Sequence, residues 1–198
     1  MTDRAAAPSF KLRFKPVDTD TWADFDTLFS ARGAPSYCWC MAWRANHQDP
    51  KVATKAGRKA AMKKLVKDGL PVGLLGYLDG EPVAWCSIAP FDTHRKLRQV
   101  ADGEETARIW SVTCFFVRRD LRGQGLTKQL LAAAVKLARK HKAKVVEGYG
   151  VKPDSPSYRY MGFVPMFEEA GFEQAGKEGT RRHVMRVPVR KSRIAPRP

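Results

Sequence analysis

Hydrophobic and polar positions in the first half of the chain follow two different periods, which predict its strands and helices. Residues 10–18 alternate between apolar and basic side chains, the period of two that is typical of a strand. In residues 21–30 the apolar positions fall on one face of a helix, and a second helix is expected over 52–68, after a proline that can open it. Two apolar runs at 72–78 and 81–89 surround an Asp-Gly pair, which predicts a β-hairpin.

The second half of the chain predicts two further buried strands on either side of a long helix. The run at 107–117 is too hydrophobic for a strand exposed on both faces. The polar segment before it, at 90–107, is expected to be a surface loop. The remaining elements are a helix from the glycines near 123 to about 141, a strand at 143–151, a short helix at 166–170 and a last strand at 183–189.

These elements predict one α/β (α+β) domain over residues 10–189, with a mixed central sheet flanked by helices. Residues 1–9 are expected to form a flexible leader and residues 190–198 a basic tail. No apolar run approaches the ~20 residues that span a bilayer, and the N-terminus lacks the apolar core of a secretory signal. We therefore expect a cytoplasmic protein without a membrane partner.

The net charge of +16 is the one unusual bulk property, and it indicates an anionic partner. Nucleic acid, a membrane surface and a polyphosphate cofactor would each meet this requirement. No motif that combines stacked aromatic and basic residues supports nucleic acid, which is therefore the weaker candidate.

The four cysteines, at positions 38, 40, 86 and 114, are too few for a disulfide scaffold in a chain of 198 residues. In a reducing compartment we expect them to be free thiols. Cys38 and Cys40 could share a metal ion with His47 or Cys86, but their spacing is not the C-x2-C of a zinc knuckle. The sequence therefore predicts neither a structural metal nor a disulfide.

The segment FFVRRDLRGQGLTKQLLAAAVKLA, residues 115–138, joins a strand-like start to an amphipathic helix through two glycines. A helix that begins after a turn presents unpaired N–H groups and the positive end of its dipole to an anion. Gly123 and Gly125 remove side chains where the backbone would approach that anion, and four basic residues surround them, namely Arg118, Arg119, Arg122 and Lys128. The pattern indicates a phosphate or pyrophosphate site, although neither G-x-x-x-x-G-K-[ST] nor G-x-G-x-x-G is present.

Residues 122–127, RGQGLT, resemble the acetyl-CoA-binding motif [RQ]-x-x-G-x-[GA] of the GNAT family of N-acetyltransferases. The motif lies between a strand end and a helix, as in that family, and MFEEAGF at 166–172 resembles the family's later helix that closes on Gly-Phe. The resemblance covers roughly residues 10–189 and implies the GNAT acyltransferase fold. Thr127 stands where the family has Gly or Ala, and because threonine is small we expect it to be tolerated.

The resemblance also implies which residues bind acetyl-CoA, the expected co-substrate. Beside Arg122, backbone amides of the turn would hold the pyrophosphate, and these belong to Gly123, Gln124, Gly125, Leu126 and Thr127. The main chain of the preceding strand end would pair with the pantetheine amides, through Phe115, Phe116 and Val117.

The family's usual catalytic groups are replaced in this chain. Many GNAT enzymes have a glutamate base on the strand before the motif and a tyrosine acid in the late helix, and Ser111 and Phe167 occupy those positions here. Glu147, within the apolar strand KVVEGYGV, is the candidate base, although it could instead be solvated or paired with an arginine. Weaker alternatives are Asp92 and His94, and the candidate proton donors are Tyr149, Tyr158 and Tyr160.

The aromatic and sulfur-rich segment SYCWCMAWR, residues 36–44, lies where GNAT enzymes usually build the acceptor pocket. Its candidate pocket residues could hold an amine by cation–π contact or exclude water, and these are Tyr37, Trp39, Cys40 and Trp43. The equal alternative is that they belong to the core.

The leading expectation is an N-acetyltransferase that moves an acetyl group from acetyl-CoA to the primary amine of a small molecule, without a metal. Because the positive charge of the protein disfavours polycations, we expect a neutral or zwitterionic amine. The alternatives are acetylation of a protein or peptide, and a GNAT-fold module that binds CoA without transfer. A homodimer also stays open.

Overall fold

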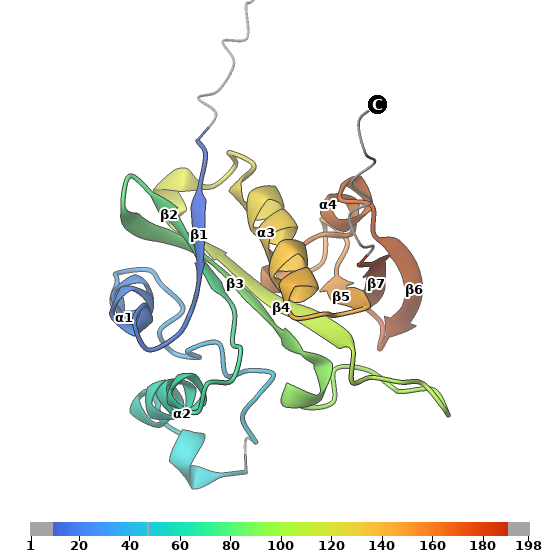
Figure 1. The fold of residues 1–198 in the computed structure, drawn as a ribbon, viewed down its shortest axis with the longest axis horizontal. Coiled ribbons are helices and arrows are strands. Elements are labelled where there is room, and N and C mark those ends of the chain that lie inside the picture. The colour runs from blue at the N-terminus through green and yellow to red at the C-terminus, as the bar shows by residue number, and fades with distance from the viewer. Residues whose placement is uncertain (1–9, 47, 190–198) are drawn as a thin grey trace, which may run out of the picture.

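The computed structural model describes residues 10–46 and 48–189, and a seven-stranded mixed sheet lies at its centre (Figure 1). The strand order is β1-β2-β3-β4-β5-β7-β6, and only β4 and β5 pair in parallel. The leader and the basic tail expected at the two ends lie outside the described residues. The strands are β1 (Arg13–Pro16), β2 (Leu74–Leu78), β3 (Glu81–Pro90), β4 (Ile109–Val117), β5 (Val145–Gly150), β6 (Glu173–Glu178) and β7 (Arg182–Pro188).

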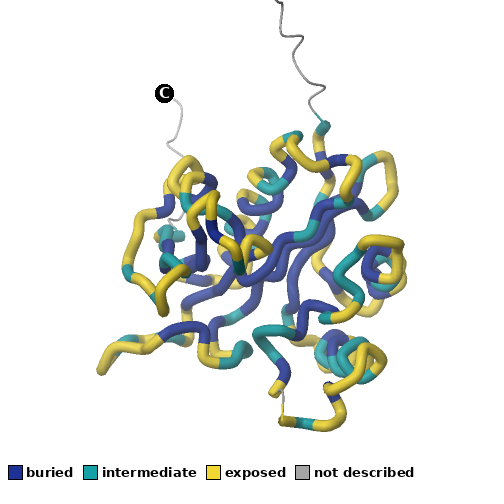
Figure 2. The backbone as a smooth tube through the Cα atoms, turned by 180° about the vertical axis from the view of Figure 1, so that it is seen from behind, coloured by how far each residue is buried: buried dark blue, intermediate teal, exposed yellow. Residues whose placement is uncertain are grey.

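Helices cover both faces of the sheet. α1 (Trp22–Ser30) and α2 (Lys55–Lys67) pack on one face, whereas α3 (Leu126–Lys140) and the short α4 (Val164–Glu169) pack on the other (Figure 1). Seen from behind, the central strands are buried along most of their length, and the exposed positions lie on helix surfaces and loops (Figure 2). No helix within the described ranges is long and apolar enough to cross a membrane. Short 3-10 helices lie at Pro50–Val52, Phe91–Thr93, Arg119–Leu121 and Arg159–Met161.

The apolar spacing of α1 and α3 explains which side each helix turns to the sheet. The buried residues of α1 recur at helical intervals, as predicted, and Phe25 packs on Trp85 of β3 with ring centroids 4.8 Å apart. On the opposite face, α3 buries an apolar stripe made of Leu126, Leu130, Leu131, Ala134 and Ala138. Each face of the sheet therefore has its own hydrophobic core.

A bulge in β4 changes which of its side chains face each core. Ser87 of β3 is opposite Cys114, but Ile88 is opposite Val112, so Thr113 is an extra residue in β4. Before the bulge Val112 packs in the α3 core, whereas after it Cys114 packs with α1 and α2. The pairing of β4 with β5 also ends at Val112, opposite Gly148. The strands therefore separate where the side-chain alternation changes.

The structure corrects several predicted elements. The first strand and the second helix are shorter than the predicted 10–18 and 52–68. The segment at 90–107 is not simply a surface loop, because Leu97 is fully buried and Arg98 is nearly so. An additional edge strand, β6, pairs with β7; its sequence EQAGKE is polar and mostly exposed, so it has no apolar alternation that could reveal it.

Candidate active site

A cavity of about 860 Å³ opens beside the C-terminal half of β4. Four parts of the chain line it, namely residues 35–43, residues 114–117 of β4, the turn at 121–128 and residues 159–166. Beside Cys114, thiols and aromatic rings line one end of the cavity. Beyond Val117, the glycine turn lines the other end. The cavity therefore brings the predicted phosphate site and part of the predicted acceptor segment together.

The glycine turn has a backbone conformation that suits an anion site. Gly123 and Gly125 have φ angles of 77° and 73°, in the left-handed region that favours glycine, and Gly125 is the N-cap residue of α3. A Cβ at either position would meet no atom of the chain within 4 Å. The glycines therefore serve the backbone angle and leave space for a ligand, in front of the first turn of a helix of 15 residues.

Most of the predicted cofactor residues line the cavity. The turn contributes Arg122, Gly123, Gly125, Leu126 and Thr127, with Lys128 beside them. Gln124 does not line it, and Arg118 instead pairs with Asp120 and Glu81 at the surface. Arg122 is held at the rim because its Nε donates a hydrogen bond of 3.0 Å to the carbonyl of Val117.

The predicted pantetheine strand, Phe115 to Val117, also lines the cavity. Because the pairing of β5 with β4 ends at Val112, the edge of β4 beyond this point faces the cavity instead of a neighbouring strand. A strand edge presents N–H and C=O groups that can pair with a ligand that carries amides. These residues fit an extended ligand with a phosphate end at the turn.

Three of the four predicted acceptor residues, Tyr37, Cys40 and Trp43, line the same cavity. Trp39 does not: it is only 1% exposed and stacks on Phe29 with centroids 5.7 Å apart, so the core alternative holds for this residue. Trp43 lies against the guanidinium of Arg182, 4.6 Å from its ring centroid. The acceptor end is thus partly aromatic, and the ring of Trp43 is held by a neighbouring cation.

Cys40 is the most unusual side chain of this end. Trp85 Nε1 donates a hydrogen bond to Cys40 Sγ at 3.2 Å. A hydrogen bond from Cys114, together with the one from Trp85 and the charge of Arg44, outweighs burial and lowers the pKa of Cys40 to about 7. By contrast, burial raises the pKa of Cys38 to about 11. All four cysteines are free, and among residues 10–46 and 48–189 no three metal-ligating side chains are grouped to hold an ion; His47 lies outside the described residues.

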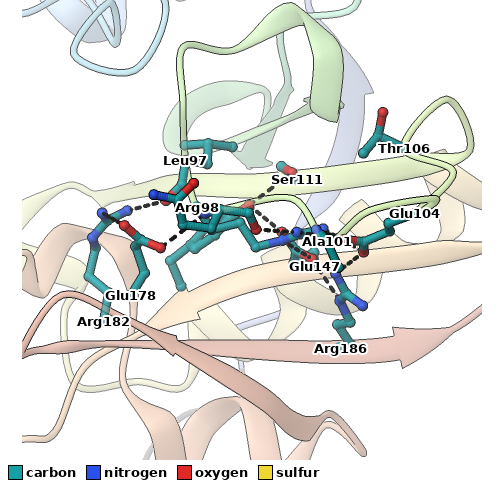
Figure 3. A network of polar contacts seen from close by, with 12 residues as sticks. Leu97, Arg98, Ala101, Glu104, Thr106, Ser111, Glu147, Glu178, Arg182 and Arg186 are labelled. Atoms are coloured by element: carbon teal, nitrogen blue, oxygen red, sulfur yellow. Dashed lines mark hydrogen bonds and ion pairs between the residues drawn. The ribbon is translucent and has the colours of Figure 1, made fainter.

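Glu147, the predicted base, does not line the cavity. Its fully buried carboxylate accepts hydrogen bonds from Arg98 Nε at 2.9 Å and from Arg186 Nε at 2.7 Å, and Tyr149 donates a third (Figure 3). Ser111, at the usual glutamate position, lies next to this group, with its Oγ 3.5 Å from the Tyr149 hydroxyl. The alternative of a carboxylate paired with arginines therefore describes Glu147 better than the role of base.

The network around Glu147 fastens the segment between β3 and β4 to β7. Glu104 of that segment accepts hydrogen bonds from Arg98 at 2.8 Å and from Arg186 of β7 at 2.5 Å (Figure 3). Arg182 of β7 donates to the carbonyl of Leu97 at 2.7 Å. These contacts explain why a polar segment buries Leu97 and Arg98, which sequence periodicity alone could not reveal.

The candidate proton donors separate in the structure. Tyr160 lines the cavity, and burial raises its pKa to about 12, so it keeps its proton at neutral pH. Tyr149 is fully buried in the Glu147 network, and Tyr158 does not line the cavity. The weaker base candidates also lie elsewhere: Asp92 accepts from Thr106, and His94, whose pKa burial lowers well below its usual range, lines a separate pocket.

Comparison with known proteins gives a consistent family. The model described as "Acetyltransferase (GNAT) family" matches residues 20–172, whereas no curated protein matches. Escherichia coli YhbS, a GNAT family N-acetyltransferase in complex with CoA, has a TM-score of 0.55 at 15% identity, over 94% of this chain and 86% of its own. Salmonella typhimurium yncA, solved with its cofactor acetyl-CoA, has a TM-score of 0.54 at 14% identity. The match covers 91% of this chain and 95% of yncA. The E. coli ribosomal-protein-S18-alanine N-acetyltransferase has a TM-score of 0.52 at 11% identity. The match covers 92% of this chain and 96% of that enzyme.

At these identities the solved structures show the fold alone, a mixed sheet flanked by helices. The family match carries more weight, because it extends over more than half of the chain. It also includes the glycine turn and every segment that lines the cavity. We conclude that the chain belongs to the GNAT family of acetyltransferases.

Proposed function

We propose that the protein transfers the acetyl group of acetyl-CoA to the primary amine of a small molecule. One observation carries this proposal: a single cavity joins the glycine turn, the free edge of β4 and an aromatic end that contains thiols. Acetyl-CoA supplies the activated acetyl group as a thioester. The backbone of Gly123 to Thr127 would hold its pyrophosphate, and the main chain of Phe115 to Val117 its pantetheine amides.

The charges around the cavity favour a neutral or zwitterionic acceptor. Its charged lining residues within the described chain are Arg122, Lys128 and Arg159, and no carboxylate lines it. A cationic wall attracts the phosphates of acetyl-CoA but repels a polycationic amine. Segment 35–43 contributes aromatic and thiol side chains to the wall of the acceptor end, which suit a small molecule.

Tyr160 is the proposed proton donor. Tyr160 lines the cavity and its hydroxyl stays protonated at neutral pH, so it can donate a hydrogen bond to a leaving thiolate. Phe167, at the family's tyrosine position, has no proton to donate and is fully buried. Tyr160 would therefore replace that tyrosine from a neighbouring segment.

Release of CoA thiol, measured with a panel of acceptors, tests the proposal. The panel contains amino acids, neutral amines, polyamines and short peptides with free N-termini. We expect turnover with members of the first two groups and little with polyamines. Turnover with peptides alone would indicate a protein N-acetyltransferase, and binding of acetyl-CoA without turnover would indicate a CoA-binding module.

A further inference from the structure

We propose that Cys40 is a catalytic nucleophile that takes the acetyl group from acetyl-CoA before the amine receives it. This inference rests on the proposed function and adds a covalent step to it. Within the described chain, no Asp, Glu or His side chain lines the cavity. The nearby carboxylate of Glu147 is engaged by Arg98 and Arg186. Among the described residues, no carboxylate on the cavity wall is therefore placed to activate the amine.

Cys40 lies where the acetyl group would be delivered. The bulge at Thr113 turns Cys114 toward the face of α1 and α2, and Cys40 meets it there on the cavity wall. The strand edge proposed for pantetheine begins at the next residue, Phe115. A ligand extended along this edge from the glycine turn would thus end beside the two thiols.

The surroundings of Cys40 favour its thiolate. The indole N–H of Trp85 points at Sγ from 3.2 Å, and Trp85 is itself fully buried, so this donor cannot turn to water. The titratable and charged groups around Cys40 are Cys86 and Cys114 of the sheet, Cys38 and Arg44 of its own segment, and Tyr160. Among these neighbours only Arg44 is a cation, and it favours the anionic sulfur.

The backbone also holds Cys40 in an uncommon conformation. Trp39 and Cys40 have φ angles of 47° and 55°, so two successive residues with side chains occupy the left-handed region. Such a conformation is strained and is found where the surrounding structure imposes it. Here the buried ring of Trp39, stacked on Phe29, fixes the position of the thiol.

The proposed step balances without an oxidant or reductant. The Cys40 thiolate attacks the carbonyl carbon of acetyl-CoA; a new C–S bond forms, the old C–S bond breaks, and its electron pair leaves with the CoA thiolate. The amine nitrogen then attacks acetyl-Cys40, so that a C–N bond forms and the Cys40 thiolate is restored. The proton lost by the amine passes to water. Exchange between two thioesters is nearly neutral in energy, which suits an intermediate.

The experiment needs no knowledge of the acceptor. The full chain is mixed rapidly with acetyl-CoA in the absence of any amine. The reaction is then quenched in acid, and the mass of the intact protein is measured by mass spectrometry. We expect one acetyl group per chain, a matching burst of free CoA, and peptide mapping to Cys40. Neutral hydroxylamine should remove this acetyl group, because it cleaves thioesters and leaves lysine amides intact.

Two variants make the test specific. Cys40→Ala should lose the burst by roughly 100-fold or more while calorimetry still shows acetyl-CoA binding. Cys86→Ala, which removes a buried thiol that does not line the cavity, should be acetylated like the wild type. As a readout apart from turnover, iodoacetamide should alkylate Cys40 with a rate that rises through about pH 7, and acetyl-CoA should slow it.

The outcomes distinguish this inference from the proposed function. If the protein binds acetyl-CoA and acetylates amines but never carries acetyl-Cys40, Cys40 is not the nucleophile. The proposed acetyltransferase function would still stand. A burst that persists in Cys40→Ala would lead to the same conclusion. Failure to bind acetyl-CoA at all would overturn both proposals.

Discussion

Single residues with left-handed backbone lie at both ends of the cavity. Gly123 and Gly125 adopt this conformation at the turn, whereas Trp39 and Cys40 adopt it at the acceptor end. Glycine does so without a steric penalty, and open space surrounds both glycines. Residues with a Cβ stay there only when their packing requires it. The two ends are therefore built differently. The turn has glycines without side chains, whereas at the acceptor end packing holds the side chains of Trp39 and Cys40 in place.

Gly125→Asp is expected to weaken binding of CoA by on the order of tenfold or more, because a carboxylate would face the pyrophosphate. The matched control is Gly69→Asp. Gly69 also has a φ of 73°, and a Cβ at this position would meet no chain atom within 4 Å, but it follows α2, away from the cavity. Both variants should lose similar stability in thermal unfolding, and calorimetry should show lower affinity in Gly125→Asp alone. Equal affinities would remove the turn from the cofactor site.

Glu147→Gln is expected to destabilise the fold by about 3–5 kcal/mol, because it leaves the buried Arg98 without its full counter-charge. Urea unfolding measures this loss, and acetyl-CoA binding should persist at concentrations where the variant is folded. Glu105→Gln is the control, since Glu105 pairs with Lys144 at the surface and both side chains are more than half exposed. If Glu147→Gln were as stable as wild type yet inactive, the role of catalytic base would return.

At the scale of elements, the segment between β3 and β4 behaves as part of the core although its sequence reads as a loop. Leu97 is fully buried, and Arg98 and Glu104 join β5 and β7 through charged hydrogen bonds (Figure 3). These partners come from positions up to 82 residues apart. The segment is therefore ordered by tertiary contacts, and its stability depends on the ionisation of its acidic members.

We expect this network to make stability depend on pH in acid. Although burial raises the pKa of Glu104, hydrogen bonds from Arg98 and Arg186 outweigh it and lower the pKa from 4.5 to about 2. A carboxylate with a lower pKa in the folded state stabilises fully above its unfolded value, and the contribution disappears as pH falls from about 4.5 toward 2. After screening by solvent, the loss should be about 1–2 kcal/mol.

Urea unfolding at about pH 6 and at about pH 3 would measure the stability that ionised Glu104 contributes. The variant Glu104→Gln should be less stable than wild type at the higher pH and lose less on acidification. A variant that loses as much stability as the wild type would contradict the assignment to Glu104.

Local patterns predicted most of the elements but not the contacts between them. The apolar face of α1 and the hairpin of β2 and β3 were readable because each depends on neighbours in sequence. β6 was missed because an exposed edge strand needs no apolar alternation. The turn at 123–125 was predictable for the same local reason as the hairpin. The surroundings of Glu147 were not predictable, because its partners Arg98 and Arg186 are distant in sequence. Their hydrogen bonds make this carboxylate part of a buried ion-pair network.

At the scale of the whole molecule, the net charge of +16 creates a positive field around a cavity whose charged lining residues are all basic. Such a field raises the local concentration of an anionic ligand and speeds its association. The cavity itself is assembled from segments between residues 35 and 166, so no single stretch of sequence describes it. This is why one motif predicted the phosphate end, whereas the meeting of Cys40 with Cys114 at the acceptor end could not be predicted from either segment alone.

CoA affinity should fall on the order of tenfold when salt is raised from about 0.05 M to about 0.5 M, because ions screen the attraction between the protein and the phosphates. Titration calorimetry at several salt concentrations measures the slope. Pantetheine, which lacks phosphates, is the control ligand, and its affinity should change little. A CoA affinity that is independent of salt would exclude a role for the field.

The bulge at Thr113 has a consequence for how β4 tolerates change. Thr113 is the extra residue, so its loss would leave Val112 and Cys114 as neighbours on opposite faces, which is the alternation of a regular strand. The thiol would stay on the face of α1 and α2, whereas loss of a residue between Cys114 and Val117 would exchange the two rows of side chains beyond it. Substitution of Thr113 removes a buried hydrogen bond, from its hydroxyl to Ser87 at 3.0 Å. Among descendants of this chain, we therefore expect loss or substitution of residue 113 to be tolerated better than loss of a residue from 115 to 117.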